Sequence, residues 1–430
     1  MSTPFEQHDG DELLLDQIQR AAFDYFAVNT NRDNGLIADT SRADSPCSIA
    51  VVGFALSAYI VGVERGWMTR ADAARRTLAA LHFFYASDQS GSAQATGSKG
   101  FYYHFLDMRR GTRVWGSELS MIDTALLIAG VLNAAVYFDA AASDERDIRE
   151  LADALYRRVD WSWSRNGGDC VLHGWKPECG FLHYGWEGYS EGIILYTLGS
   201  GSPTHPLPES SFEAWTLTYQ WEHLYGTDVL YAGPLFIHLY SHAWIDFRGI
   251  RDRFMREKRC DYFENTRRAI CIQTEYAQRN PNGFVGYGDN AWGLTACEGP
   301  YARVMKIAGQ QHGSFGYAAR GAPHGPDDGT LAGWAAAASL PFAPETALAA
   351  VRSLWAADPA HDHLLASGFN PTLRGADHND WISPGRFGLD QGIVLLMIEN
   401  HRSGLIWRLM RDCPPLRVGL RRAGFRGGWL

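Results

Sequence analysis

The sequence predicts an all-α protein, a single-domain (α/α)6 barrel in which about twelve helices form two rings. Apolar residues recur with helical spacing along most of the 430 residues, nearly apolar segments alternate with amphipathic ones, and neither a composition break nor a low-complexity linker divides the chain. Helices of an inner ring are buried on all sides and helices of an outer ring on one face. The alternation is therefore typical of a double ring of helices.

The individual helices follow from periodicity and capping. Residues 11–28 have the apolar spacing of an amphipathic helix, and residues 47–65 are nearly apolar all round. Thr69, with Asp72 three residues later, caps a helix over 70–86. The other expected helices cover residues 117–138, 145–164, 190–199, 211–225, 233–245, 260–279, 328–339, 344–356 and 390–411.

Strands are not expected between these helices. We expect residues 11–411 to form the barrel, residues 1–10 to be disordered, and the basic residues 412–430 to form a frayed C-terminal tail. Four connections are long and rich in Gly, Trp, Tyr, His and Asp, namely 87–116, 165–189, 280–327 and 357–389. Loops of this length are usually functional or disordered, and their aromatic content argues against disorder. They predict a ligand cleft at one end of the barrel.

Composition excludes several classes of function. A formal net charge of −9 and a pI near 5.9 argue against nucleic acid as a partner. Seven cysteines without a CxxC pair indicate neither a disulfide framework nor a zinc site. The N-terminal residues lack the pattern of a signal peptide, and Asp123 and Asn133 interrupt the apolar run at 121–138. We therefore expect a cytoplasmic protein without a membrane helix; a periplasmic location is the alternative if the start is processed or export is unconventional.

The long loops supply what a sugar-binding cleft needs, which is aromatic rings for stacking and polar side chains for hydroxyl groups. Glycosidic cleavage also requires a protonated carboxyl group and a second carboxylate. Glu191 follows Trp186 and Tyr189 and precedes an apolar run. An apolar environment raises the pKa of a carboxyl group, so Glu191 is the first candidate for the acid. Glu187 is a weaker candidate, and Glu191 could instead be a charge that stabilises a helix N-terminus.

The second carboxylate must come from elsewhere in the chain. Asp123 lies in an otherwise apolar helix, where an unpaired charge is costly, and Asp390 opens the last apolar helix, where it could also be an N-cap. Further acidic candidates are Asp39, Asp289, Glu298, Asp327, Asp328 and Asp380.

Metal and cofactor sites are not expected. His238 and His242 have the spacing of two ligands on one helix face, but a third ligand is missing, so a packed or hydroxyl-binding pair is favoured. The "GPDDGT" segment at 325–330 reads as a turn with an N-cap, and if calcium were bound we would expect it there. A P-loop and a dinucleotide fingerprint are both absent from the sequence.

Several motifs resemble the glucoamylase-like domain family, which includes the bacterial β-1,2-glucanases of glycoside hydrolase family 144. They run in the family's order from about residue 14 to 411 and include "IDTALLIAG", "GYSEGIILYTLGSGSPTHP", "PLFIHLYSHAWIDFRGIRD", "GFVGYGDNAWGLTACEGP" and "LDQGIVLLMIENHRSGLIWRLM".

This resemblance implies an (α/α)6 barrel that cleaves β-1,2-linked glucans with inversion at the anomeric carbon. The family's proposed general acid falls on Glu191, and the base is expected at Asp390, then Asp123, then Asp380. A sophorooligosaccharide or β-1,2-glucan is the expected partner, with no cofactor. Substrate contacts are expected at Asp39, Arg42, Trp115, Trp186, Tyr189, His205, His242, Tyr287, Trp292 and Glu298.

Three functions remain open at this point. The first is a hydrolase of linear or cyclic β-1,2-glucan. The second is a transglycosylase with the same cleft, which would differ in how well it excludes water. The third is a non-catalytic glycan-binding protein, which is disfavoured because candidate catalytic carboxylates are present. A terpene cyclase is excluded because the chain lacks a DDxxD motif.

Overall fold

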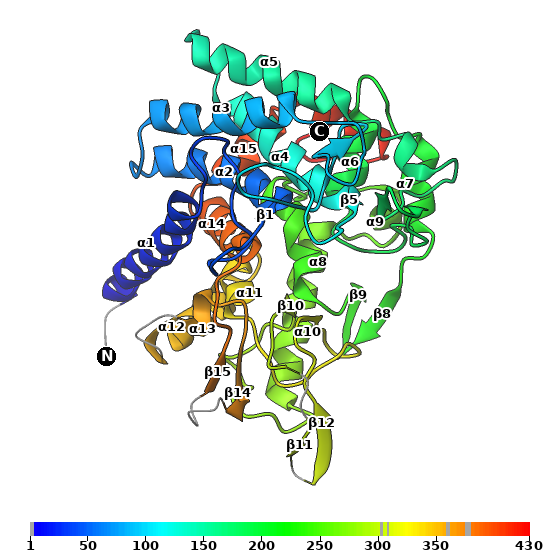
Figure 1. Ribbon diagram of the computed structural model, residues 1–430. Coiled ribbons are helices and arrows are strands. Elements are labelled where there is room, and N and C mark those ends of the chain that lie inside the picture. The colour runs from blue at the N-terminus through cyan, green and yellow to red at the C-terminus, as the bar shows by residue number, and fades with distance from the viewer. Residues whose placement is uncertain (1–3, 302–303, 308, 358–361, 375–379) are drawn as a thin grey trace. The chain divides into compact units, whose positions relative to one another are not determined.

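The computed structural model describes residues 4–301, 304–307, 309–357, 362–374 and 380–430 (Figure 1). The chain divides into two compact units. Unit 1 contains residues 1–24, 221–240 and 263–402, and unit 2 contains residues 25–220, 241–262 and 403–430. Helix α1 (Pro4–Val28) runs from the first into the second. Its first turns lie in the segment 1–10 that we expected to be disordered.

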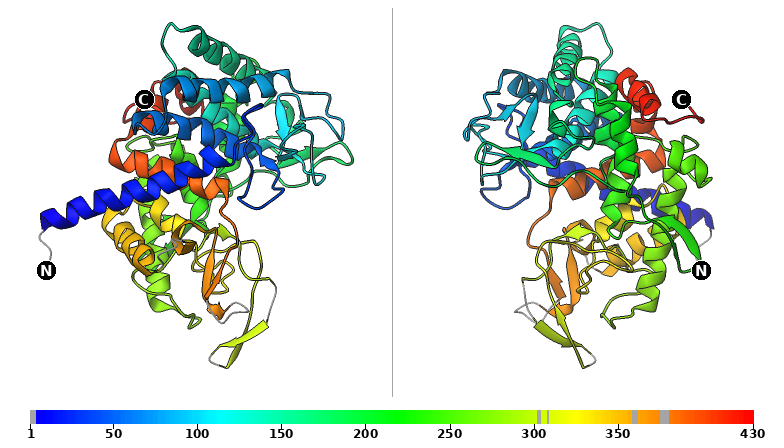
Figure 2. Two further views of the ribbon diagram at one scale, coloured as in Figure 1. Left: turned by 60° about the vertical axis from the view of Figure 1, so that its left-hand side comes forward. Right: turned by 90° about the vertical axis from the view of Figure 1, so that its right-hand side faces the viewer.

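Unit 2 contains both buried helices and helices that bury a single face, as the alternation of apolar and amphipathic segments predicts. Helices α2 (Ile49–Glu64) and α4 (Met121–Tyr137) are buried along nearly their whole length. Helices α3 (Arg70–Ala86) and α5 (Ser143–Arg158) bury one face each. Figures 1 and 2 show α3 between α2 and α5.

Two glycines allow α2 and α4 to cross closely. A Cβ on Gly53 would lie 2.2 Å from the carbonyl oxygen of Leu126, and a Cβ on Gly130 would lie 2.0 Å from the carbonyl oxygen of Gly53. Any side chain at either position would therefore push the helices apart. The crossing fixes α4, which carries Asp123 in its first turn.

The C-terminal tail is not frayed. Residues Pro414–Arg422 form α16, an amphipathic helix that packs against α6 (Ile193–Gly201). A Cβ on Gly419 would lie 1.9 Å from the carbonyl oxygen of Thr197, so the two backbones are nearly in contact. The arginines that made this segment look like a solvated tail occupy the polar face of the helix. The remaining helices of unit 2 are α7 (Glu209–Thr216), α9 (Arg253–Glu257), α15 (Leu405–Arg411) and the short 3-10 turn η1 (Trp163–Arg165).

Unit 2 also contains a small antiparallel sheet, although strands were not expected between the helices. Its order is β2-β3-β5-β6-β7, with strands Gly97–Ser98, Phe101–Tyr103, Leu119–Ser120, Gly174–Lys176 and Gly180–Phe181. A separate pair joins β1 (Cys47–Ser48) to β4 (Phe105–Leu106). Strands of two or three residues are too short to show an alternating pattern. They nevertheless bring the 87–116 and 165–189 connections together at the N-terminus of α4.

Unit 1 repeats the pairing of buried and amphipathic helices. Helix α11 (Gly333–Ala338) is fully buried and packs against α14 (Gly388–Arg402), which is buried along most of its length. Helix α12 (Pro344–Ala357) buries one face. The other helices are α8 (Leu235–Leu239), α10 (Tyr262–Arg279) and α13 (Asp362–Leu365). The first residue of α10 belongs to unit 2. The 3-10 turn η2 (Tyr240–Ala243) begins in unit 1 and ends in unit 2.

Several expected helices are interrupted: 145–164 ends at Arg158 before the 3-10 turn η1, and 233–245 is divided into α8 and the 3-10 turn η2. The segment 211–225 ends as a helix at Thr216 and continues as β8 (Trp221–Leu224), which pairs with β9 (Thr227–Leu230). Tyr225 and Gly226 both have positive φ, as a two-residue hairpin turn requires. The segment 390–411 is split at Gly404, which has a φ of 68°.

Further hairpins in unit 1 pair β10 (Ala296–Cys297) with β13 (Ala318–Ala319), β11 (Val304–Ile307) with β12 (Gln310–Gly313), and β14 (Phe369–Arg374) with β15 (Asp380–Ile382). The hairpin β11–β12 extends away from the helices of its unit (Figure 2). Among the described helices, none is long and apolar enough to cross a bilayer.

Candidate active site

Glu191 lies immediately before α6 in unit 2, and Ser241 fixes its backbone. The Ser241 hydroxyl donates to the carbonyl oxygen of Glu191 at 2.7 Å and accepts from the amide of Ile194 at 3.2 Å. Trp186, 9% exposed, stacks on His173 with ring centroids 4.2 Å apart. The apolar helix and Ser241 therefore hold Glu191 at a defined position.

Burial changes the acidity of Glu191. Loss of water around the carboxyl group raises its pKa from 4.5 to about 7; a hydrogen bond to its own backbone opposes this change, and the negative charge of Asp123 adds to it. The residue as a whole keeps some solvent exposure, as a group that contacts a substrate must. A large fraction of Glu191 therefore carries a proton at neutral pH.

Asp123 belongs to a group of polar side chains at the N-terminus of α4. The Ser120 hydroxyl donates to Oδ2 of Asp123 and accepts from its backbone amide at 3.2 Å. Nε2 of His104 lies 3.5 Å from the same Oδ2, and Nδ1 of His104 lies 3.1 Å from Oε1 of Glu118. We call His104, Glu118, Asp123, Asp39 and Glu191 the carboxylate cluster.

The members of the carboxylate cluster have unequal proton affinities. Burial raises the pKa of Asp39 to about 6, with His104 and Arg42 lowering it and Asp123 raising it. Burial alone would lower the pKa of His104, but Asp123, Glu118 and Asp39 together raise it to about 9. The cluster therefore contains both a group that gives up a proton near pH 7 and a cation at that pH.

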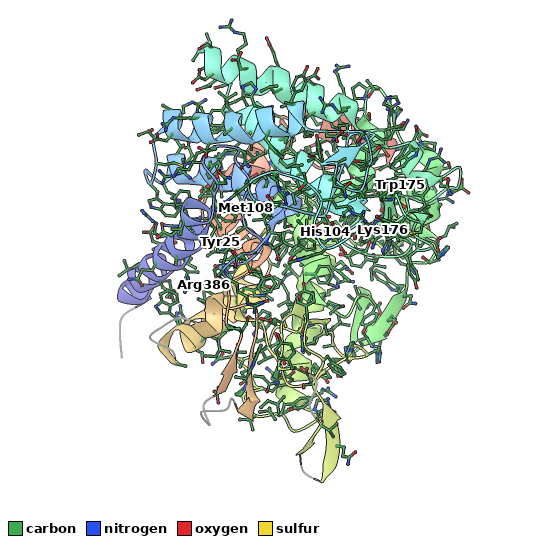
Figure 3. The ribbon with its side chains drawn as sticks, in the orientation of Figure 1. Tyr25, His104, Met108, Trp175, Lys176 and Arg386 are labelled. Atoms are coloured by element: carbon green, nitrogen blue, oxygen red, sulfur yellow. The ribbon has the colours of Figure 1, made fainter. Side chains whose placement is uncertain are left out.

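Aromatic rings connect this cluster to the surface of unit 2. Trp115 is 72% exposed, and its ring centroid lies 5.1 Å from that of Phe105. Phe105 in turn stacks on His104 at 3.9 Å with an interplanar angle of 12°. Figure 3 shows His104, Trp175 and Lys176 in the same region of unit 2. Exposed rings of this kind suit stacking on sugars.

Other predicted substrate residues of unit 2 differ in their surroundings. Tyr189 stacks on Tyr262 at 5.8 Å, and Arg42 is exposed near Asp39. His205 follows the C-terminal end of α6, whereas Glu191 precedes its N-terminal end, and nine residues of helix span roughly 13 Å. His205 lies 3.9 Å from Asp160, and its contact with the substrate stays a prediction.

His242 is 2% exposed and packs against Phe247, so its predicted contact with a hydroxyl group of the substrate is not supported. His238, in unit 1, is equally buried; its Nε2 donates to the carbonyl oxygen of Ala232 at 3.0 Å, and burial lowers its pKa to about 4. Both histidines are core side chains, in agreement with the packed interpretation.

Unit 1 contains the other predicted residues. Asp390 lies in the first turn of α14 and is 5% exposed. Oε2 of Glu298 accepts from the Ser383 hydroxyl at 2.5 Å. Trp292 was predicted as a sugar platform, but it is 1% exposed and belongs to the core. Asp380 is exposed on β15.

The two aspartates of the "GPDDGT" segment have structural partners. Asp328 forms a fully buried bidentate ion pair with Arg320, at 2.7 and 2.8 Å. Asp327 accepts from the hydroxyls of Tyr287 at 2.5 Å and Tyr276 at 2.8 Å. Among the described residues, no group of three or more His, Cys, Asp or Glu side chains has an arrangement that could hold a metal ion.

His104, Glu118 and Ser241 are site residues that the sequence pattern does not predict. His104 and Glu118 are 14 residues apart and meet because β3 pairs with β5. Strands this short leave no pattern in the sequence from which their pairing could be predicted. Ser241 lies 50 residues from Glu191. A signal did exist for His104, which is flanked by aromatic residues in "KGFYYHF".

Comparison with known proteins gives the family. Residues 183–414 match the glycoamylase family model, described as "Putative glucoamylase". A crystal structure of a protein from Bacteroides uniformis that carries the same description is 30% identical, with a TM-score of 0.86 and coverage of 98% of both chains.

Two further relatives have more specific names. The endo-β-1,2-glucanase of Chitinophaga pinensis, solved with sophorotriose and glucose, is 26% identical over 98% of this chain and 99% of that chain, with a TM-score of 0.83. The exo β-1,2-glucooligosaccharide sophorohydrolase (non-reducing end) of Parabacteroides distasonis is 27% identical over 96% of this chain. This chain spans 58% of the length of that relative.

The likeness to these structures confirms the predicted all-α, (α/α)6-barrel class. The chain belongs to the glucoamylase-like family, so the resemblance seen in its motifs is confirmed as well.

Proposed function

We propose that this protein is a glycoside hydrolase that cleaves β-1,2-glucan or sophorooligosaccharides with inversion, and that Glu191 is its general acid. The observation that carries this proposal is the buried carboxyl group of Glu191, whose pKa is raised to about 7 beside the negative charge of Asp123. A general acid works best when its pKa lies near the working pH. The names of two relatives, an endo-β-1,2-glucanase and a sophorohydrolase, support the substrate.

The base is proposed to be Asp390 or Asp123. Asp123 accepts a hydrogen bond from Ser120 and lies beside the imidazole of His104. Asp390, which opens the last apolar helix, remains the first-ranked candidate. Comparing Asp390→Asn with Asp123→Asn separates the two, because the variant that keeps the wild-type rate is eliminated as the base.

Product analysis tests the proposal. The protein is incubated with linear and cyclic β-1,2-glucans and with β-1,3-, β-1,4- and α-1,4-glucans, and NMR follows the anomeric configuration of the first product. We expect cleavage of β-1,2 linkages, with α-configured products. Longer oligosaccharides among the products would indicate a transglycosylase, and binding without any product would indicate a glycan-binding protein.

Glu191→Gln has a matched control in Glu187→Gln, four residues earlier and exposed. Loss of a positioned general acid lowers kcat by about 10²- to 10⁴-fold. We expect that loss for Glu191→Gln with intact sugar binding, and a rate near that of the wild type for Glu187→Gln. Equal rates for the two variants would remove Glu191 as the acid.

A further inference from the structure

His104 is held from three sides in unit 2. Its backbone amide donates to the carbonyl oxygen of Glu118 at 2.9 Å, and its carbonyl oxygen accepts from Ile49 at 3.3 Å. Its ring stacks on Phe105, and its two ring nitrogens lie 3.1 Å from Glu118 and 3.5 Å from Asp123. An imidazole with a carboxylate at each nitrogen is placed to donate from both, which only the protonated ring can do.

The charged groups around His104 come from several elements. Glu118 precedes β5; the charge of Lys176 on β6 lowers the pKa of Glu118, and Glu118 in turn acts to raise the pKa of His173. Asp123 belongs to α4.

The third carboxyl group is that of Asp39, in the connection between α1 and β1, with Arg42 close to it. Glu191 is coupled to the cluster through the charge of Asp123. Carboxyl groups therefore predominate around His104.

We propose that His104 is a positioning residue that stays positively charged during the reaction and keeps Glu118 and Asp123 ionised, so that the proton of the carboxylate cluster resides on Glu191. This inference rests on the proposed function, because it assigns His104 a part in keeping the acid protonated.

The physical reason is competition for protons among adjacent carboxyl groups. Without a cation, neighbouring carboxylates repel one another and one of them takes up a proton. Protonated Asp123 would no longer disfavour the charge on Glu191, whose pKa would then fall. The pKa of Asp39 would rise, because His104 now lowers it. A neutral residue at position 104 therefore moves the alkaline limit of activity to lower pH.

The first experiment measures the charge of His104 directly. The histidines are labelled with ¹⁵N, the signal of His104 is assigned as the one missing from His104→Gln, and the ring is titrated from pH 5 to 10. We expect the imidazolium to persist to a pKa of about 9. In Glu118→Gln, which keeps a hydrogen-bond acceptor and removes the charge, the pKa of His104 should fall. A wild-type His104 that titrates at or below 6.5 overturns the proposal.

The second experiment compares pH profiles of kcat/KM on β-1,2-glucan. In His104→Gln we expect the alkaline limb, which reports the acid Glu191, to move to lower pH by about one unit, the lower end of the effect of a close charge. His104→Arg keeps a positively charged hydrogen-bond donor at this position. It should therefore restore most of the pH range over which the wild-type protein is active. His82→Gln, on the exposed side of α3, is the control and should leave the profile unchanged.

The outcomes separate a charge effect from a packing effect. A His104→Gln profile that is lower but equally wide would show a merely structural role and would overturn the inference. If His104→Gln does not fold, Glu118→Gln gives the same test with a smaller narrowing. A wild-type protein without turnover on β-1,2-glucan would refute the proposed function, while the NMR titration would still decide the charge of His104.

Discussion

Replacing Glu191 by Gln should make the folded protein more stable at alkaline pH while it removes activity. The pKa of Glu191 is about 7 in the folded state, compared with 4.5 for the group in its ordinary environment. A carboxyl group with a raised pKa in the folded state contributes stability that is fully present below the unfolded pKa and is lost as the pH rises through the folded pKa. Above pH 7 the wild-type protein therefore carries a buried charge that glutamine does not.

The magnitude follows from the two pKa values. One pKa unit corresponds to about 1.36 kcal/mol. As the pH rises from 4.5 to 8, the free energy of unfolding of Glu191→Gln should therefore increase relative to that of the wild type by at most about 3 kcal/mol. With an unfolding entropy of about 2.1 cal/mol/K per residue, this raises Tm by roughly 3 °C for a chain of this length.

Thermal unfolding of wild type, Glu191→Gln and Glu187→Gln at pH 5.5, 6.5, 7.5 and 8.5 measures this difference. Tm of Glu191→Gln relative to the wild type should climb with pH, whereas Glu187→Gln, with an exposed side chain, should show no trend. A pH-independent difference for Glu191→Gln would refute the inference that burial raises its pKa.

Three further outcomes are expected. Asp123→Asn removes the charge that helps raise the pKa of the acid, so the alkaline limb of a kcat/KM profile should move to lower pH. Gly53→Ala places a Cβ 2.2 Å from a backbone oxygen of α4, and a fall in Tm of several degrees should be seen by calorimetry. Arg320→Met leaves Asp328 buried without its ion-pair partner, which should cost about 3–5 kcal/mol in urea unfolding; adding Asp328→Leu should recover part of that loss.

The helices that carry the candidate site were predictable because burial imposes periodicity over many residues. Segment 117–138 is apolar with a single aspartate, and the structure buries α4 and places Asp123 in its first turn. Glu191 was predictable for a related reason, since an apolar run follows it directly. The family and the enzyme class expected from the motifs agree with the relatives' names.

Features that depend on contacts across the chain were not predictable. The meeting of His104 with Glu118 requires a strand pairing of two residues, and Ser241 reaches Glu191 across 50 residues. Trp292 has the same sequence signature as an exposed sugar platform, yet it is buried. Composition alone does not distinguish a ring that stacks on a ligand from one that packs in a core.

The last residues of unit 2 pack against α6, the helix that begins next to Glu191. Arg422 donates to the carbonyl oxygen of Ser200 at 2.9 Å, and Gly419 lets α16 meet the middle of α6 backbone to backbone. A chain that ends before Pro414 would lack α16, which packs against one side of α6. The position of the segment that carries Glu191 would then be less well fixed. If Glu191 is the acid, such a shortened chain should therefore lose activity although all the candidate catalytic residues are still present.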